Sequence, residues 1–130
     1  MASRLLAARL ESSLKRPSLN ITVEQWRILF YLWNEDGINQ QELAKRANKE
    51  KSTITRQIEG LIKKELVVKQ KRGSDKRDKL IFLTENGKKM ETEALSVAWD
   101  ITHDAEKGID KDELQIFKKV LQQIIENVKP

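Results

Sequence analysis

The chain has 130 residues, of which 38% are hydrophobic and 35% are charged, and its formal net charge at pH 7 is +5. This length is typical of one domain, and the apolar residues recur at regular intervals, so we expect a single folded domain over residues 1–130. The lack of cysteine and the single histidine exclude disulfides, thiolate zinc sites and multi-histidine metal sites, so no metal or other cofactor is predicted.

The N-terminal segment predicts an amphipathic helix over residues 3–15, which ends before Pro17 and Ser18. Its apolar face consists of Leu5, Leu6, Leu10 and Leu14. Acidic and polar residues interrupt this segment, whereas a signal peptide needs an unbroken apolar stretch. No apolar run in the sequence approaches the roughly 20 residues that cross a bilayer. We therefore expect a cytoplasmic protein that does not interact with a membrane.

Two helices are predicted next, and a capping pattern begins each of them. Thr22 with Gln25 starts a helix over residues 23–34, and Asn39 with Glu42 starts a short helix that ends at Asn48. The apolar residues of the first, which we expect to be largely buried, are Trp26, Leu29, Phe30, Leu32 and Trp33. The inward residues of the second are Leu43, Ala44 and Ala47.

A third helix, over about residues 50–64, follows after a tight turn, and its spacing divides it into two faces. The inward stripe is Ile54, Ile58, Leu61 and Ile62. The opposite face carries Ser52, Thr53, Arg56, Gly60 and Lys63. Two helices joined in this way are typical of a helix-turn-helix.

A β-hairpin is predicted directly after this helix. Apolar residues at 66–68 and again at 80–83 read as two strands, and the polar run over 71–78 reads as the loop between them. The sequence therefore predicts a two-stranded hairpin with a long, basic tip.

Two helices are expected to complete the chain. Thr84 caps a long one that ends at Gly108, with a stripe formed by Met90, Ala94, Val97, Ala98, Ile101 and Ala105. Asp110 with Glu113 caps the last one, whose apolar residues are too numerous for a helix that rests on one small domain. We predict that they bury against a second subunit. The predicted dimer interface is Leu5, Leu6, Leu10, Leu114, Phe117, Leu121, Ile124, Ile125 and Val128.

Positive charge is concentrated in one part of the chain. Residues 45–79 hold thirteen Lys or Arg and five acids, a net charge of +8, while the other 95 residues carry a net charge of −3. This distribution favours a polyanionic partner, and its alternative is a solvated basic face without a partner.

The outward side chains of the third helix suit the major groove of DNA, where small, hydrogen-bonding or cationic groups reach base edges. Arg56 can pair with a guanine edge, and Ser52 and Thr53 suit phosphates or bases, although capping of their own helix is the alternative for these two. In the hairpin, arginines suit a narrow minor groove, and Asp75 is expected to hold Arg77 in place. The predicted DNA-binding residues are Lys49, Lys51, Ser52, Thr53, Thr55, Arg56, Gln57, Lys63, Lys71, Arg72, Asp75 and Arg77.

Three stretches resemble one known family. They are I-N-Q-Q-E-L-A-K-R-A, then S-T-I-T-R-Q-I-E-G-L-I-K-K-E-L-V, then D-K-R-D-K-L-I-F-L-T-E-N-G, and in the third Asp75-x-Arg77 with Leu83-Thr84 and Gly87 is similar to the family's wing signature. Together they resemble the multiple-antibiotic-resistance regulator (MarR) family over about residues 19–90.

The resemblance implies a mainly α fold with a small β-hairpin wing, in which a winged helix-turn-helix lobe (about 20–88) is flanked by dimerisation helices (about 3–16 and 89–129). It implies a homodimeric, sequence-specific regulator that binds a pseudopalindromic double-stranded DNA operator and acts as a ligand-responsive repressor. Members of the family often sense a small-molecule effector, at a ligand site that this sequence does not locate. Glu65 stands where the family usually has a glycine that ends the recognition helix, so either Glu65 adopts a left-handed conformation at a cost of about 1 kcal/mol or the helix ends differently. Lys49 and Glu50 replace a more usual apolar residue and a serine cap, so the start of the helix is expected to shift by one residue.

Other readings of the sequence remain open. A winged helix also serves as a protein-interaction adaptor, and here its basic patch would bind an acidic partner. The tryptophans Trp26, Trp33 and Trp99 fit a core better than an effector pocket, and His103 is expected at the surface. Asp100, His103 and Asp104 have the spacing of only a weak metal site. No catalytic constellation is found in the sequence, so we do not expect an enzyme.

Overall fold

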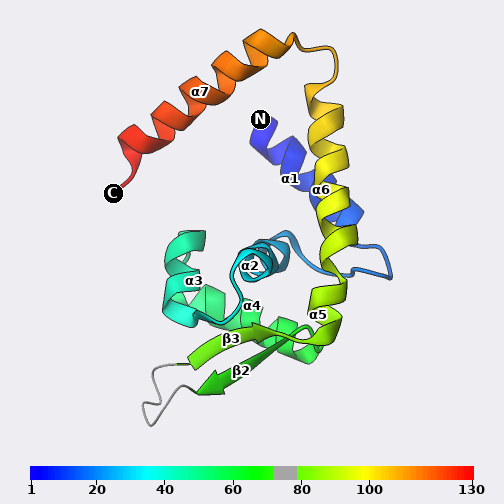
Figure 1. Cartoon of the computed structure of the whole chain (residues 1–130), viewed down its shortest axis with the longest axis vertical. Helices are drawn as coiled ribbons and strands as arrows, with labels where there is room; N and C mark the ends of the chain where they lie inside the picture. Colours follow the sequence, from blue (N-terminus) through cyan, green and yellow to red (C-terminus); the bar gives the residue numbers. More distant parts are fainter. Residues whose placement is uncertain (72–78) are drawn as a thin grey trace. The chain divides into compact units, whose positions relative to one another are not determined.

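The computed structural model describes residues 1–71 and 79–130, and it is mostly helical with one small antiparallel sheet. The elements in chain order are α1 (Ala2–Leu14), α2 (Val23–Asn34), β1 (Ile38–Asn39), α3 (Gln40–Ala47), α4 (Lys51–Lys63), β2 (Val67–Lys71), β3 (Lys79–Leu83), α5 (Glu85–Lys89), α6 (Glu91–Glu106) and α7 (Lys111–Val128) (Figure 1). The chain divides into two compact units, Met1–Ala98 and Trp99–Pro130. The predicted fold class, mainly α with a β-hairpin wing, is confirmed.

The core of the first unit is built on α2, whose start is fixed by its predicted capping box. The Thr22 hydroxyl accepts a hydrogen bond from the Gln25 amide at 3.1 Å, and the Gln25 side chain accepts one from the Thr22 amide at 3.1 Å. One face of the helix then buries Ile28, Leu29 and Leu32. Phe30 is exposed and stacks on Trp26 with the ring centroids 5.3 Å apart, so the helix is less completely buried than its composition suggested.

The turn between α3 and α4 depends on Asn48, whose φ of 51° lies in the left-handed region that asparagine tolerates. The following Lys49 amide donates to the Ala44 carbonyl at 3.0 Å, which satisfies the end of α3. This tight turn places α4 against α2 and α3, and its stripe Ile54, Ile58 and Leu61 is at most 2% exposed. The predicted helix-turn-helix is therefore present.

The end of α4 has the geometry of a Schellman motif without its usual glycine. Glu65 has a φ of 60°, the Glu65 amide donates to the Ile62 carbonyl at 2.9 Å, and the Leu66 amide donates to the Leu61 carbonyl at 3.0 Å. Leu61 and Leu66 are both buried, as the hydrophobic contact of this motif requires. Of the two alternatives for Glu65, the structure has the left-handed conformation in place of a glycine.

The sheet has three strands in the order β1-β3-β2, so the prediction of a two-stranded structure was incomplete. The two-residue strand β1 pairs antiparallel with β3 through Ile38 opposite Ile81. The hairpin strands β2 and β3, which lie side by side in Figure 1, pair from Val67 opposite Leu83 to Lys71 opposite Lys79. Lys71 thus ends β2 instead of beginning the loop.

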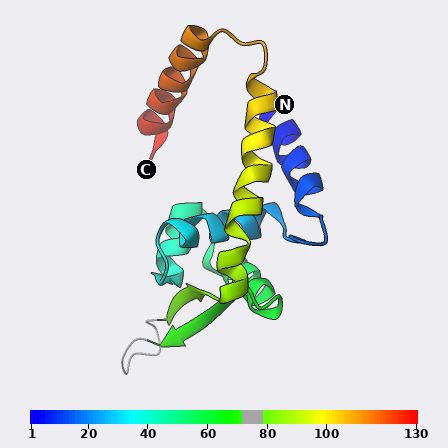
Figure 2. The same cartoon turned by 45° about the vertical axis from the view of Figure 1, so that its right-hand side comes forward.

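The long helix predicted after Thr84 was wrong in one respect, because it is divided at Met90 into α5 and α6. The Thr84 hydroxyl accepts from the Gly87 amide at 3.1 Å and caps α5. In Figure 2 the segment that follows α1 reaches the first turns of α6, and there the Ser18 hydroxyl donates to the Glu93 carboxylate at 2.5 Å. Ala94 and Val97 of α6 are buried as predicted.

The second unit contains the last turns of α6 and the whole of α7, and Asp110 caps α7 by accepting from the Asp112 and Glu113 amides at 3.0 and 3.2 Å. Trp99 is 64% exposed and stacks on His103 with the ring centroids 4.9 Å apart. The prediction that Trp99 belongs to the core was therefore wrong for the single chain, because its ring is exposed and its stacking partner is His103, one turn further along the same helix. His103 is exposed, as expected.

Candidate nucleic-acid interface

The outward face of α4 is built by the same helical spacing that buries its apolar stripe. Ser52 and Arg56 are exposed, and they lie on the side opposite Ile54 and Ile58, which are 2% and 0% exposed. Packing of the stripe therefore fixes the rotation of α4 about its axis and presents one guanidinium and one hydroxyl to the solvent, and the ammonium group of Lys51 is exposed at the first residue of the helix. These are groups that donate to base edges and phosphates.

A second row of α4 side chains turns toward α2 and away from this outward face. Thr53 and Gln57 are half-buried and line a small crevice beside Ile28 of α2. Gly60, one turn further on, also belongs to this row, because a Cβ built on Gly60 would lie 2.7 Å from Nε2 of Gln25. The placement of Gly60 on the outward face was therefore wrong, since Gly60 faces the Gln25 side chain of α2.

The start of α4 bears on the alternative in which Ser52 and Thr53 cap their own helix. The N-cap is Glu50, with an extended backbone at φ −67° and ψ 151°, so the helix starts one residue later than predicted. Ser52 and Thr53 are then the second and third helical residues, and within the described chain no side-chain hydrogen bond caps this end. The hydroxyl of the exposed Ser52 thus does not serve as a cap.

Thr55 lies on the other flank of the outward face, toward α3, and is held by two hydrogen bonds. Its Oγ1 donates to the Lys51 carbonyl oxygen at 2.8 Å, and Nε2 of Gln40 donates to the same Oγ1 at 2.6 Å. Gln40 is the first residue of α3, so this contact joins the starts of the two helices of the helix-turn-helix. Gln40 has no distinguishing signal in the sequence, because a polar residue at the start of a helix is ordinary.

Two of the cations in the basic region serve the fold. Arg46 donates from Nη2 to Glu35 at 2.8 Å and from Nε to Glu42 at 3.1 Å, and these hydrogen bonds, that to Glu35 first, raise the pKa of the guanidinium. Lys64 donates from Nζ to the Asn20 carbonyl at 2.7 Å and to Oε1 of Gln25 at 2.8 Å, and burial lowers the pKa of its ammonium group. The net charge of the region therefore overstates the charge available to a partner.

The remaining predicted DNA-binding residues are dispersed around α4. Lys49 is exposed in the turn before the helix, Lys63 is exposed in its last turn, and Lys71 is exposed at the end of β2. Arg72, Asp75 and Arg77 lie outside the described residues. The structure thus brings Lys49, Lys51, Ser52, Arg56 and Lys63 to exposed positions on and beside one helix.

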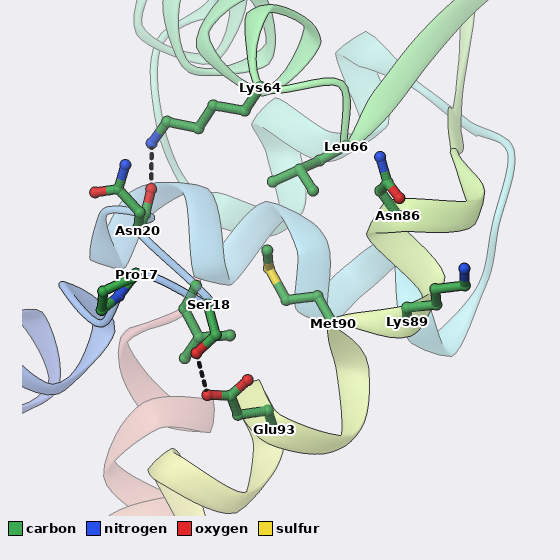
Figure 3. Close-up of a pocket in the computed structure, with 10 residues that line it drawn as sticks. Pro17, Ser18, Asn20, Lys64, Leu66, Asn86, Lys89, Met90 and Glu93 are labelled. Atoms are coloured by element: carbon green, nitrogen blue, oxygen red, sulfur yellow. Dashed lines mark hydrogen bonds between the residues drawn. The ribbon is translucent and has the colours of Figure 1, made fainter.

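A hollow of about 460 Å³ lies next to the end of α4, between the segment Pro17–Asn20 and the α5–α6 junction. Figure 3 shows Lys64 reaching in from one side and Asn86 with Lys89 from the other, while Met90 and Leu66 lie between them. Glu93, also in its wall, accepts a hydrogen bond from Ser18 and lies 4.0 Å from the Arg16 guanidinium. The wall of the hollow therefore combines apolar side chains with two ammonium groups.

The residues predicted to form a dimer interface leave apolar surface exposed in each unit. In α1, Leu5 and Leu6 are 64% and 46% exposed, and Leu10 is half-buried. In α7 no residue is buried; the exposed predicted residues are Phe117, Leu121, Ile124, Ile125 and Val128, and Leu114 is half-buried. Ile116 and Val120 widen the exposed face of α7.

Two further properties concern the part of the chain that the structure describes. None of its helices is long and apolar enough to cross a membrane. Within residues 1–71 and 79–130, no three His, Asp or Glu side chains gather as they would around a metal ion, and Asp100, His103 and Asp104 do not form such a group.

A helix-turn-helix followed directly by an antiparallel hairpin defines a winged helix-turn-helix protein, and the cationic outward face of α4 is what this class uses to contact DNA. Comparison with known proteins refines this class. Residues 21–79 match the model of the MarR family. The winged helix-turn-helix lobe of the chain is thus of the MarR type, the type found in a family of transcriptional regulators.

Individual relatives agree with this assignment. The chain is 24% identical over 113 residues to the organic hydroperoxide resistance transcriptional regulator of Bacillus subtilis, with 85% of this chain and 74% of that protein covered. Its fold resembles the crystal structure of a MarR transcriptional regulator from Methanosarcina mazei, with a TM-score of 0.87, 28% identity, and coverage of 96% and 88%. A putative MarR family regulator from Listeria monocytogenes, crystallised with 26mer DNA, has a TM-score of 0.87, 25% identity, and coverage of 98% and 83%.

Proposed function

We propose that this protein is a cytoplasmic, homodimeric transcriptional regulator that binds a specific double-stranded DNA operator through α4 and the hairpin that follows it. The observation that carries the proposal is the outward face of α4, where Ser52 and Arg56 are exposed while the opposite face is buried in the chain's own core, with Lys51 exposed at the start of the same helix. The similarity to a Listeria regulator crystallised with DNA supports the same use of the fold.

Within this proposal the exposed residues have distinct roles. Arg56 reads a guanine edge in the major groove, because a guanidinium donates two parallel hydrogen bonds to O6 and N7. Lys49, Lys51 and Lys63 contact phosphates and supply affinity that depends on salt. Arg72 and Arg77, named from the sequence alone, contact the minor groove from the hairpin. The protein acts by binding, without catalysis.

The second subunit is part of the proposal because each unit of the chain leaves an apolar helix face exposed. On α7 the exposed fractions of Phe117, Leu121 and Ile124 are 61%, 43% and 51%, an apolar surface that a soluble monomer rarely displays. In a two-fold dimer, each such face packs against the same face of the partner subunit. It also presents two copies of α4 to a pseudopalindromic operator whose half-sites are roughly 34–36 Å apart.

The hollow beside Lys64 supports a response to a small molecule. The hydrogen bond from Lys64 to the Asn20 carbonyl joins the end of α4 to the segment after α1. A ligand that hydrogen-bonds to the Lys64 ammonium competes with Asn20 and Gln25 for the contacts that hold the end of α4. Whether the outcome is repression or activation depends on the operator's position. We propose repression, since an occupied operator excludes other proteins.

The test begins with selection of bound fragments from random duplex DNA, followed by titration of the selected duplex at several salt concentrations. We expect log K to fall linearly with log salt, and we expect Arg56→Ala to lose about 1–3 kcal/mol on the selected duplex with relaxed specificity at one base pair. Lys107→Ala removes one positive charge from an exposed position in the other unit and serves as the matched control.

Two outcomes contradict the proposal. The first is equal affinity of the wild-type protein for selected and scrambled duplexes. The second is the absence of duplex binding at low salt together with tight binding of an acidic protein, which is the behaviour of an adaptor.

A further inference from the structure

The hydrogen-bonded pair formed by Gln40 and Thr55 connects the two helices of the helix-turn-helix at the edge of the outward face. Thr55 follows Lys51 by one turn and directly precedes Arg56, both of which are exposed. Gln40, from the start of α3, is half-buried, and its Nε2 lies 2.6 Å from the Thr55 Oγ1. The pair therefore lies beside the groups that the proposed function assigns to DNA.

The direction of this hydrogen bond follows from the chemistry of a hydroxyl group. Thr55 has a single hydroxyl proton, and it is donated to the Lys51 carbonyl oxygen at 2.8 Å. Thr55 can then only accept from Gln40, so the NH2 end of the Gln40 amide, and not its oxygen, must face Thr55. The orientation of the Gln40 amide is thereby fixed.

A side-chain amide has two N–H donors, and the contact with Thr55 uses one of them. Among the described residues this contact is the one hydrogen bond of the Gln40 side chain, so its second N–H is available to a ligand at the edge of α4. Thr55, in contrast, has already donated its proton. The hydroxyl that the sequence suggested as a reader of DNA has no donor left for a phosphate or for an acceptor on a base.

We infer that Gln40 contacts the DNA backbone, its free N–H donating to a phosphate oxygen, and that Thr55 is a positioning residue that aims the Gln40 amide. This inference rests on the proposed function. A phosphate is the appropriate partner because the first helix of a helix-turn-helix crosses the DNA backbone while the second enters the groove. Phosphate oxygens only accept, and the group that Gln40 offers is a donor.

The contact differs in kind from those of the neighbouring lysines. A neutral amide donates a hydrogen bond to a phosphate without neutralising its charge, so no counterion is released when it binds. Loss of Gln40 must therefore weaken binding to any duplex by a similar factor and leave the slope of log K against log salt unchanged. Loss of a lysine that contacts a phosphate lowers that slope.

The experiment measures affinities of the full-length protein for the selected duplex and for a scrambled duplex of equal length, each at several salt concentrations. The variants are Gln40→Ala, Thr55→Val, Thr55→Ser and the double variant Gln40→Ala with Thr55→Val. A neutral hydrogen bond is worth about 0.5–1.5 kcal/mol, so we expect Gln40→Ala to bind both duplexes ~2–12-fold more weakly, with an unchanged salt slope.

The Thr55 variants separate positioning from contact. Thr55→Val keeps the shape of the side chain and removes its acceptor, so we expect a loss no larger than that of Gln40→Ala and no additional loss in the double variant. Thr55→Ser restores the acceptor and is expected to bind as the wild type does. Thermal unfolding of each free variant shows that it is folded at the temperature of the titrations.

Each other outcome overturns the inference. If Gln40→Ala loses affinity only for the selected duplex, Gln40 contacts a base and not a phosphate. If the losses of affinity add in the double variant, Thr55 contacts DNA independently of Gln40. If Gln40→Ala binds as tightly as the wild type, Gln40 does not contact DNA. Failure of the proposed function has a different signature, because the wild-type protein and Arg56→Ala then bind both duplexes equally or not at all.

Discussion

The helices α4 and α7 carry similar apolar stripes, yet the structure treats them differently. The stripe of α4 is covered by the chain's own core, with Ile58 and Leu61 at 0% exposure. The stripe of α7 has no buried residue, and Ile124 and Ile125 are 51% and 42% exposed. Helical periodicity thus shows which face of a helix leaves water, and it does not show whether the same chain or another copy covers that face.

The largest expected effect comes from breaking the proposed partner contact of α7. The double variant Leu121→Glu with Ile125→Glu places two charges one turn apart on the apolar stripe, and Glu is a good helix former, so α7 itself is retained. We expect sedimentation velocity to show a monomer, and we expect the affinity for a two-half-site operator to fall by about 10²–10⁴-fold, because the second half-site is no longer bound intramolecularly.

Its matched control adds the same charge outside the stripe. Gln122→Glu with Gln123→Glu changes two exposed polar positions of the same helix and is expected to leave the dimer intact. A Leu121→Glu, Ile125→Glu protein that sediments as a dimer contradicts the comparison between the two helices.

The next effect concerns the stripe that the chain covers itself. Ile58→Ala leaves a cavity in a fully buried site, and we expect the free energy of unfolding to fall by about 2–5 kcal/mol. Urea denaturation at several protein concentrations measures this loss, which should be similar at each of them. Ile116→Ala, at a position 63% exposed in the single chain and on the face that the proposed dimer covers, is the counterpart on α7. Its loss of stability is expected to depend on protein concentration, and a loss as large as that of Ile58→Ala at every concentration contradicts the comparison.

The smallest effect is a gain in stability at the end of α4. Glu65 has a φ of 60°, which costs a residue with a Cβ about 1 kcal/mol, so Glu65→Gly is expected to raise the free energy of unfolding by ~1 kcal/mol without changing affinity for DNA. Glu65→Ala removes the carboxylate and retains the backbone strain. The same denaturation measures the free energy of unfolding of both variants. If Glu65→Ala raises it as much as Glu65→Gly does, the gain comes from removal of the charge and not from relief of the backbone strain at φ 60°.

Much of the fold was predictable because its signals lie within a few residues of one another. The capping box at Thr22 and Gln25, the left-handed Asn48 and Glu65, and the stripe of α4 each depend on neighbouring residues, and the structure has all of them. The hairpin was predicted on the same basis, but β1 was missed, since two residues are too few to show the alternation of a strand.

The proposed site was predictable in outline and not in detail. Ser52, Arg56 and Lys63 share an exposed face by helical spacing alone, whereas the turn of Thr53, Gln57 and Gly60 toward α2 depends on how α4 packs. The neutralisation of Arg46 by Glu35 likewise needs the approach of two helices.

The sequence by itself determined where helices begin and end and which stripe of each avoids water, because caps and periodicity act between residues at most four apart. Tertiary structure decided which long-range partners meet: Ile38 with Ile81, Gln40 with Thr55 and Lys64 with Asn20. The reason is physical: a hydrogen bond between distant segments forms only after the packing of whole helices has brought its donor and acceptor together.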